Sequence, residues 1–325
     1  MKKITAVILA AGKGTRMRSP LPKVLHEVCG STLLECVICS VQKAEIPRII
    51  IVVGDKKEEV EESLEGLPVE IVEQREQLGT AHAVIAAKDR INSSDDIVLI
   101  LNGDAPLIKP RTLKKLISIN NETAADVVLL TARLEKPKGY GRIYRDKNGG
   151  IAKIIEESEA CGDVLAINEI NAGIYAFKTK DLLEGLCEIL PRNKKGEFYL
   201  TDIISLLHNK GKKIEGIEAD DAVEVLGINT QQELAIVNKI RCDEILQGFM
   251  ESGVTIVDTG STFVENNVEI GAGTKIYPFS YISKNVVIGR YCRIGPFSYL
   301  ESGTKVSDGT EVKSSEREWK TSFLR

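Results

Sequence analysis

A short segment near the start of the chain combines a glycine-rich turn with positive charge. The stretch LAAGKGTRM covers residues 9–17 and follows the strand-like run KKITAVI. Two glycines let backbone N–H groups approach a polyphosphate, and basic side chains can neutralise it. The basic residues within this short span are Lys13, Arg16, Arg18 and Lys23. The composition predicts a triphosphate-holding loop, with an ordinary strand-to-helix turn and solvated basic residues as the alternative.

Residue spacing excludes the two best-known phosphate loops. A P-loop has a glycine five positions before its Gly-Lys pair, and Val7 stands there before Gly12 and Lys13. A dinucleotide loop of the G-x-G-x-x-G type needs a final glycine, and Met17 occupies that position. The loop therefore belongs to neither kind.

A carboxylate follows a second strand-like run. Asp104 comes directly after DIVLILNG at 96–103. Its oxygens suit Mg²⁺, which takes one or two protein oxygens and completes its shell with water and phosphates. The position predicts a magnesium ligand, although turn formation explains an aspartate after a strand equally well.

Strands and helices alternate up to about residue 250. The β-branched runs at 48–54 and 96–104 predict strands buried on both faces. Helical periodicity marks the segments 80–91, 111–119 and 200–211. This alternation indicates a largely parallel sheet covered by helices. Ligands of such sheets bind beyond the carboxyl ends of the strands, where the glycine-rich turn and Asp104 both fall.

A six-residue period takes over after about residue 252. The aliphatic residues in register are Val264, Ile270, Ile276, Ile282, Ile288, Ile294, Leu300, Val306 and Val312. This period is typical of a left-handed parallel β-helix, in which short strands stack coil upon coil. Residues 230–253 predict a long amphipathic helix that links the two patterns. Residues 313–325 break the period and predict a polar cap or a loose end.

The composition is that of an ordinary soluble protein. The chain has 325 residues, enough for two domains, with 43% hydrophobic and 28% charged residues and a formal net charge of -4. No strongly charged field indicates nucleic acid as a partner. No early apolar run resembles a membrane span or a signal peptide. We therefore predict a cytoplasmic protein without a membrane partner.

Cysteine and histidine spacing gives no metal site. Only Cys36 and Cys39 form a C-x-x-C, and no second pair accompanies them. They lie in a helix-like run with Thr32 and Glu35 spaced as a capping box, so we interpret them as buried helix thiols. The histidines, which are His26, His82 and His208, lie far apart in the sequence.

Eight segments together resemble the sugar-phosphate nucleotidyltransferases. They are LAAGKGTRM, LPKVL (21–25), EQLGTAHA (76–83), NGDAPL (102–107), GYGRI (139–143), EINAGIYAF (169–177), GEFYLTDII (196–204) and LGINT (226–230). The likeness is closest to the uridylyltransferase half of the bacterial bifunctional enzymes that make UDP-N-acetylglucosamine. It implies a Rossmann-like α/β domain with a mixed, mostly parallel sheet, followed by a short left-handed parallel β-helix. The boundaries we predict are 1–229, a linker helix at 230–252, and 253–325.

The resemblance implies a reaction and a set of residue roles. The phosphate of N-acetylglucosamine 1-phosphate would attack the α-phosphorus of UTP, and Mg²⁺-pyrophosphate would leave. Arg16 and Lys23 would stabilise the phosphates. The implied nucleotide-binding residues are Ala11, Gly12, Gly14, Gln74, Gln77, Gly79 and Thr80. The implied sugar-binding residues are Gly141, Glu156, Asn171, Tyr199 and Thr201, and the implied Mg²⁺ ligands are Asp104 and Asn229.

Several of these residues have a structural alternative. Asn229 could cap the helix that begins near Thr230, and local sequence favours this interpretation. Gln74 and Gln77 could be solvated loop residues, and Glu156 could lie on the surface within a charged run.

The chain departs from the family in four respects. The bifunctional members are longer and carry an acetyltransferase in the β-helix, whereas this chain ends after roughly three coils. Glu301 aligns with a sugar-phosphate arginine, and no histidine follows His208 to act as general base. We therefore predict no acetyltransferase activity. Asn102 replaces a frequent aromatic residue, which leaves another hexose 1-phosphate, or thymidine instead of uridine nucleotides, as alternatives.

The predicted partners are UTP and N-acetylglucosamine 1-phosphate, with Mg²⁺ as cofactor. Hexapeptide β-helices in such enzymes commonly form trimers, so the resemblance also implies a homo-oligomer, with a trimer favoured. The competing hypothesis is a catalytically silent regulatory or scaffold protein on the same two domains. That hypothesis predicts loss of the phosphate-contacting residues, which are present here.

Overall fold

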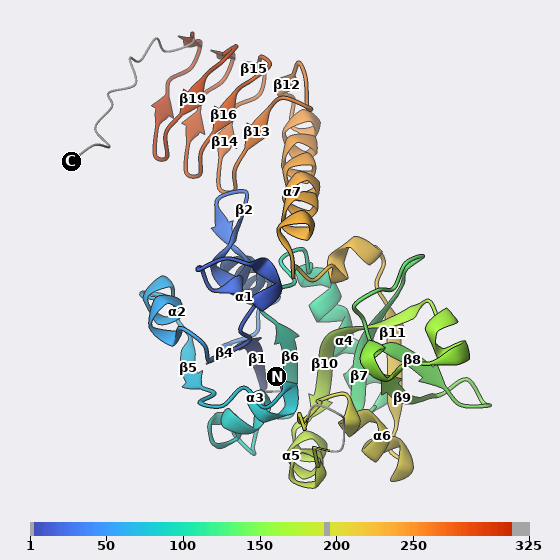
Figure 1. Ribbon diagram of the computed structural model, residues 1–325. Coiled ribbons are helices and arrows are strands. Elements are labelled where there is room, and N and C mark those ends of the chain that lie inside the picture. Colours follow the sequence, from blue (N-terminus) through green and yellow to red (C-terminus); the bar gives the residue numbers. More distant parts are fainter. Residues whose placement is uncertain (1–2, 192–195, 314–325) are drawn as a thin grey trace. The chain divides into compact units, whose positions relative to one another are not determined.

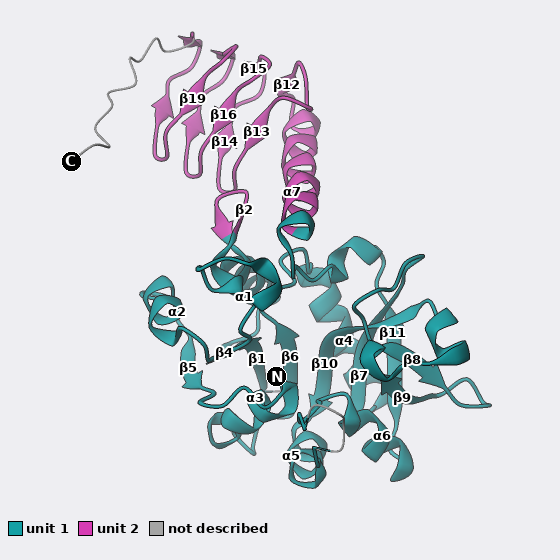
Figure 2. Cartoon of the chain, viewed as in Figure 1, with its two compact units in different colours: residues 1–26, 32–233 teal, residues 27–31, 234–325 magenta. Residues whose placement is uncertain are grey.

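The computed structural model describes residues 3–191 and 196–313 (Figure 1). The chain divides into two compact units (Figure 2). The first comprises residues 1–26 and 32–233, and the second comprises residues 27–31 and 234–325. The predicted cap or loose end at the C-terminus lies almost wholly outside the described residues.

The first unit is built on a nine-stranded mixed sheet. Its strands are β1 (Ile4–Ala10), β4 (Arg48–Val53), β5 (Glu70–Glu73), β6 (Ile97–Asn102), β7 (Val127–Arg133), β8 (Arg142–Arg145), β9 (Ile151–Ile155), β10 (Glu169–Lys178) and β11 (Ile214–Glu218). The order along the main path is β11-β7-β10-β6-β1-β4-β5, and β8 pairs with β10 and β9. Along this path only β10 is antiparallel to its neighbours. The predicted α/β class with a mostly parallel sheet is confirmed.

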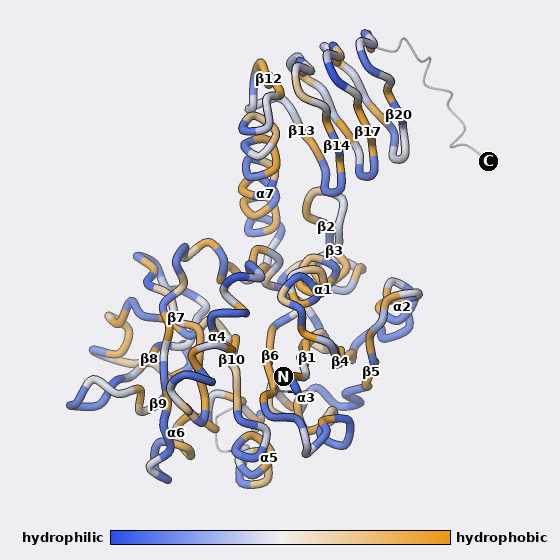
Figure 3. Tube along the Cα trace, turned by 180° about the vertical axis from the view of Figure 1, so that it is seen from behind, coloured by the Kyte–Doolittle hydropathy of each residue, from blue (hydrophilic) through white to orange (hydrophobic). Residues whose placement is uncertain are grey.

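Helices bury both faces of this sheet. They are α1 (Leu33–Lys43), α2 (Lys57–Ser63), α3 (Thr80–Ala86), α4 (Pro110–Thr123), α5 (Thr179–Glu188) and α6 (Asp202–Asn209). One apolar core joins α1 and α4 to Ile8 of β1, and a second core joins α3, α5 and α6 to Val7. Successive residues of a strand point to opposite faces, so a run buried on both sides must be apolar throughout. Figure 3 shows this hydrophobic character along β1 and β6.

Local sequence signals place two of the helices. Thr32 and Glu35 form the predicted capping box at the start of α1. The predicted helix at 80–91 is instead α3 followed by a 3-10 turn, η3 (Lys88–Arg90).

The interpretation of Cys36 and Cys39 as buried thiols is wrong, because Cys39 is exposed and Cys36 is only half-buried. Both cysteines lie beside the apolar face of α1, which the leucine, valine and isoleucine side chains occupy.

The second unit contains the parallel β-helix. Its strands are β12 (Thr255–Ile256), β13 (Phe263–Val264), β14 (Glu269–Ile270), β15 (Lys275–Ile276), β16 (Tyr281–Ile282), β17 (Val287–Ile288), β18 (Arg293–Ile294), β19 (Tyr299–Leu300), β20 (Lys305–Val306) and β21 (Glu311–Val312). Every third strand pairs in parallel, which makes three stacked faces. The predicted six-residue repeat is confirmed, since each of its aliphatic residues is the second residue of one strand from β13 to β21.

A long helix and a short hairpin complete the second unit. Helix α7 (Gln231–Glu251) occupies the segment predicted to be helical. Its apolar residues do not gather on one face, because Ile236 is 57% exposed while the polar Asn238 is half-buried. The predicted amphipathic pattern of this helix is therefore wrong, and one of its polar residues binds the hairpin formed by β2 (Glu27–Val28) and β3 (Ser31–Thr32). Asn238 Oδ1 accepts a 2.8 Å hydrogen bond from the backbone N–H of Cys29.

Among the described residues, no helix combines the length and the apolar composition that a membrane crossing requires.

Candidate active site

Strand direction brings the predicted site segments to one edge of the sheet. β1 and β6 run in parallel and end at Ala10 and Asn102. β10 is antiparallel to β6, so its beginning, with Asn171, lies at the edge where β6 ends. β11 runs parallel to β7 and therefore leaves the sheet at the same edge, toward LGINT at 226–230.

A cleft of about 480 Å³ opens at this edge. Its lining residues are Leu9, Ala10, Ala11, Gly12, Lys13, Thr15, Lys23, Val24, Gln74, Gln77, Gly79, Thr80, Ala83, Asn102, Asp104 and Glu197. All of the predicted nucleotide-binding residues except Gly14 are among them. The cleft therefore collects residues from the first four of the eight motifs and, through Glu197, from GEFYLTDII.

Gly14 and Gly12 meet different steric requirements in the glycine-rich turn. Its φ angle of +59° lies in the left-handed region, and an added Cβ would stand 2.6 Å from Cβ of Lys23. At Gly12 an added Cβ would meet nothing within 4 Å. Gly14 lets the turn η1 (Thr15–Met17) pass close to η2 (Lys23–Leu25), whereas Gly12 leaves open space at the cleft.

Two cationic side chains and two side-chain oxygen atoms lie in contact beside the cleft. The Lys23 ammonium forms an ion pair with Oδ2 of Asp104 and donates a 2.7 Å hydrogen bond to Oδ1 of Asn229. Nη2 of Arg16 donates to the same Asn229 oxygen at 2.7 Å. Four residues from four separate motifs thus contact one another.

The alternative that Asn229 caps the following helix is wrong. Oγ1 of Thr230 accepts a 3.2 Å hydrogen bond from the N–H of Glu233, and Oε2 of Glu233 accepts from the N–H of Thr230 at 2.9 Å. This reciprocal pair is a capping box. Because Thr230 supplies the cap of α7, the side chain of Asn229 can turn toward Arg16 and Lys23.

Backbone and phenol contacts hold the LGINT segment beside Asp104. The N–H of Ile228 donates to the carbonyl oxygen of Asp104 at 3.0 Å. The hydroxyl of Tyr140 accepts from the N–H of Gly227 at 3.1 Å and donates to the carbonyl of Val225 at 3.4 Å. Burial raises the pKa of this phenol, so it stays protonated and keeps its donor proton.

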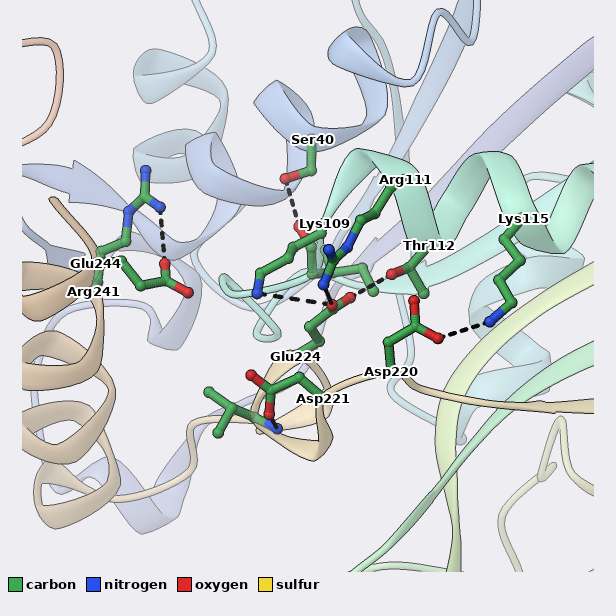
Figure 4. A network of polar contacts seen from close by, with 12 residues as sticks. Ser40, Lys109, Arg111, Thr112, Lys115, Asp220, Asp221, Glu224, Arg241 and Glu244 are labelled. Atoms are coloured by element: carbon green, nitrogen blue, oxygen red, sulfur yellow. Dashed lines mark hydrogen bonds and ion pairs between the residues drawn. The ribbon is translucent and has the colours of Figure 1, made fainter. Parts of the chain in front are cut away.

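A buried carboxylate fastens the same segment to α4 (Figure 4). Glu224 lies in the 3-10 turn η6 (Ala222–Val225) and has no exposed surface. It accepts a hydrogen bond from Oγ1 of Thr112 and forms ion pairs with Arg111 at 3.3 Å and Lys109 at 3.9 Å. Since α4 follows Asp104 closely and η6 precedes Asn229, Glu224 ties together the two segments that carry these oxygen donors.

Gln74 is buried in the wall of the cleft. It is 3% exposed, which rules out a solvated loop residue. Its Nε2 donates to the carbonyl oxygen of Gly79 at 3.1 Å and lies 3.0 Å from Nδ1 of His82. Gln77 is half-buried and donates from Nε2 to the backbone carbonyl of Gln74 at 3.2 Å. Gly79 has a φ angle of +111°, and an added Cβ would stand 2.5 Å from the carbonyl oxygen of Phe198.

The predicted sugar-binding residues form a neighbouring group outside the lining of this cleft. Thr201 donates from Oγ1 to Oε1 of Glu156 at 2.8 Å. The N–H of Asn171 donates to the carbonyl of Gly141 at 2.9 Å. Burial, with the charge of Glu197 second, raises the pKa of Tyr199 to about 12, so this phenol is a hydrogen-bond donor at neutral pH. The half-buried Glu156 and its partner show that it is not a free surface residue.

An ion pair fixes the start of the strand that carries Asn171. Arg145 of β8 donates to both carboxylate oxygens of Glu169, from Nε at 2.9 Å and from Nη2 at 2.7 Å. Burial raises the pKa of Glu169, but the hydrogen bonds and charge of Arg145 outweigh it and hold the pKa below its ordinary value. The bidentate pair therefore joins β8 to β10 next to the sugar-side group.

Sequence comparison with known proteins identifies the family of this chain. Residues 6–160 match the MobA-like NTP transferase domain, and residues 267–302 match the bacterial transferase hexapeptide repeats. Bifunctional protein GlmU of Clostridioides difficile is 42% identical over 310 residues, which cover 95% of this chain and 67% of the relative. The chain belongs to the GlmU family. GlmU proteins of Acetivibrio thermocellus and Pelotomaculum thermopropionicum are both 44% identical, over 86% and 85% of this chain. The chain spans 60% of the length of these two relatives.

Family membership confirms the resemblance on which the residue roles were predicted. The structure of this GlmU-family chain also adds cleft residues to which the sequence assigned no role. Glu197 and Asn102 line the cleft, and His82 lies behind Gln74. Glu197 lies within the motif GEFYLTDII, and His82 lies within EQLGTAHA. Their position inside motifs that carry predicted site residues is the sequence signal that could have identified them. Asn102 was noted only as a departure from close relatives.

The donor set suits a hard cation in this GlmU-family site. Among the described residues, no three His, Cys, Asp or Glu side chains gather as a metal site. Asp104 and Asn229 nevertheless offer a carboxylate oxygen and an amide oxygen that converge on the ammonium of Lys23. Mg²⁺ needs only one or two protein oxygens when phosphates and waters supply the rest. The residues present therefore fit Mg²⁺.

Proposed function

We propose that this chain transfers UMP from UTP to N-acetylglucosamine 1-phosphate with Mg²⁺, giving UDP-N-acetylglucosamine and pyrophosphate. The observation that carries the proposal is the convergence of Arg16, Lys23, Asp104 and Asn229 beside one cleft. Two cations with two oxygen donors match a metal-bound triphosphate in charge and in ligand type. Membership in the GlmU family supports the same reaction class.

The phosphate-side residues would act by position and charge. Lys23 and Arg16 would exchange their present oxygen partners for phosphate oxygens and so reduce the negative charge that repels the incoming sugar phosphate. Asp104 and Asn229 would hold Mg²⁺, which when bound withdraws charge from the transferred phosphate. Phosphoryl-type transfer needs little covalent chemistry from a protein, so charge stabilisation and alignment supply most of the rate.

The two ends of the cleft region would select the two substrates. Gln74, Gln77 and Gly79 offer amide and backbone groups for the edge of uracil. Glu156 and Asn171 offer a carboxylate and an amide for the sugar hydroxyls and N-acetyl group, with Gly141, Tyr199 and Thr201 beside them. Asn102 lines the cleft where relatives often carry an aromatic residue, so another hexose 1-phosphate is the alternative sugar substrate.

Two further proposals concern the β-helix. We propose that residues 253–325 catalyse no acetyl transfer, because Glu301 aligns with a sugar-phosphate arginine of the family and its negative charge would repel a phosphate. We also propose that the β-helix associates with other copies, a trimer being favoured. Phe279 and Phe297 stack with ring centroids 4.9 Å apart, yet they are 59% and 64% exposed, and exposed aromatic surface favours association.

The test is pyrophosphate release by the purified protein with Mg²⁺. UTP, dTTP, GTP and ATP are each combined with the 1-phosphates of N-acetylglucosamine, glucosamine, glucose, galactose and mannose. Release confined to UTP with N-acetylglucosamine 1-phosphate is expected, and Asp104→Ala should abolish it while Asp220→Ala, at an exposed carboxylate, should not. Another preferred pair would reassign the substrates, whereas no release from any pair by folded protein would favour the silent scaffold.

A further inference from the structure

His82 contacts a residue of the cleft wall but takes no part in the proposed chemistry. It is the third residue of α3, and its ring packs near Phe198 with centroids 6.2 Å apart. Its Nδ1 lies 3.0 Å from Nε2 of Gln74. Because Gln74 is almost fully buried, the partners of its amide decide which of its two polar atoms can meet a ligand.

The contacts of Gln74 identify each atom of the amide. A backbone carbonyl oxygen can only accept a hydrogen bond, so the atom 3.1 Å from the oxygen of Gly79 must be the NH₂ nitrogen. That nitrogen has a second proton, and His82 Nδ1 is the acceptor within reach. A ring nitrogen that accepts carries no proton itself, so the His82 imidazole is neutral and holds its proton on Nε2. Both amide protons are then used, and only Oε1 of Gln74 can contact a ligand.

We propose that His82 determines the base specificity of the site by holding the Gln74 amide in this orientation. The proposal rests on the function proposed above, in which Gln74 contacts the nucleotide base. An oxygen that can only accept attracts a pyrimidine with a ring N–H, as in uracil, and repels one with a bare ring nitrogen, as in cytosine. His82 is therefore a specificity-determining residue that acts through Gln74.

His82 opposes rotation of the Gln74 side-chain amide. Turning the Gln74 amide by half a turn would place Oε1 against the carbonyl oxygen of Gly79, so that acceptor would face acceptor, and His82 could donate to Oε1 only by moving its proton from Nε2 to Nδ1. The rotated amide would offer its NH₂ group to the base and would accept cytosine. Removing the His82 acceptor leaves Gly79 as the single opposing contact, so the two orientations come closer in free energy.

The proposal is tested by the ratio of kcat/KM for UTP to that for CTP. His82→Phe keeps a ring beside Phe198 but removes the acceptor, and the ratio should fall by about tenfold, the scale of one hydrogen bond. His82→Asn is the matched control, because its Oδ1 can stand where Nδ1 stands, and its ratio should stay within about threefold of the unmodified protein. A His82→Phe ratio equal to that of the unmodified protein would overturn the proposal.

A second measurement separates this inference from the proposed function. If the unmodified protein does not use UTP, the proposed function fails, and the His82 tautomer is then read from the ring-nitrogen signals in long-range ¹H–¹⁵N NMR spectra. The chain has three histidines, so the signals lost in His82→Asn assign those of His82. A proton on Nε2 alone supports the proposal, and a proton on Nδ1 overturns it.

Discussion

Replacement of Glu224 tests whether a buried carboxylate holds the two candidate metal ligands together. Its side chain has no exposed surface, and it links η6, which precedes Asn229, to the start of α4, which follows Asp104. Glu224→Ala removes the acceptor for Thr112 and both ion pairs. Glu224→Gln keeps the side-chain volume and one acceptor oxygen but removes the charge.

The expected loss follows from what each partner can do afterwards. Thr112 is 3% exposed, so its hydroxyl would lose its acceptor where water cannot replace it. Such an unsatisfied buried group lowers the free energy of unfolding by about 1–3 kcal/mol. The side chain of Arg111 is 62% exposed and that of Lys109 32% exposed, so both cations regain water and add little. With the cavity left by the side chain, Glu224→Ala should lower the free energy of unfolding by about 2–4 kcal/mol, and Glu224→Gln by about half as much.

Two assays check this reasoning. Urea unfolding followed by circular dichroism measures the free energy, and the Mg²⁺ concentration at half-maximal turnover measures whether Asn229 still lies beside Asp104. The Mg²⁺ requirement should rise several-fold for Glu224→Ala. Asp220→Asn is the control, because Asp220 also joins the segment around η6 to α4, through Lys115. This ion pair is exposed and contributes less than about 1 kcal/mol. The reasoning is refuted if Glu224→Ala is as stable as Asp220→Asn.

Three further predictions use the same assays. Gly14→Ala should lower kcat by at least about tenfold, because its Cβ would push Lys23 from its place. Asn229→Ala should abolish turnover and leave stability unchanged, whereas Thr230→Ala should cost about 1 kcal/mol of unfolding free energy and leave kcat unchanged. Glu169→Gln should cost about 1 kcal/mol at pH 7 and progressively less in acid, because a carboxyl with a lowered folded-state pKa stabilises above its ordinary pKa of 4.5 and loses that effect as the pH falls through the folded value.

Each of these predictions has a control or an outcome that contradicts it. Gly66 has a φ angle of +79° and open space for a Cβ, so Gly66→Ala shares the backbone strain of Gly14→Ala without the clash. Equal kcat losses in both would contradict the argument from close approach. Near-normal turnover by Asn229→Ala would remove it as a metal ligand. A Glu169→Gln effect that grows toward acid would show that the sign of the pKa shift is wrong.

Much of the fold could be predicted because its signals are local. The six-residue repeat fixes every strand from β13 to β21, since each aliphatic residue must face the inside of a coil. The β-branched run at 96–104 predicts β6 by a different local signal, because a strand covered on both faces must be apolar on both. The α7 segment was predicted to be an amphipathic helix, and the helix is present, but its apolar residues do not form one face. Its polar Asn238 instead accepts a hydrogen bond from Cys29, more than 200 positions away.

The sequence by itself determined the identity and order of the motifs, and through them the family and the residues that reach the cleft. Only the tertiary structure decided how those residues divide their tasks. Thr230 takes the cap and frees Asn229, His82 orients the amide of Gln74, and Glu224 joins two segments that are distant in the chain. The physical reason is that a hydrogen bond or ion pair depends on distance and direction in space. A local pattern shows which residue could form such a contact, and the packed chain shows which residue does.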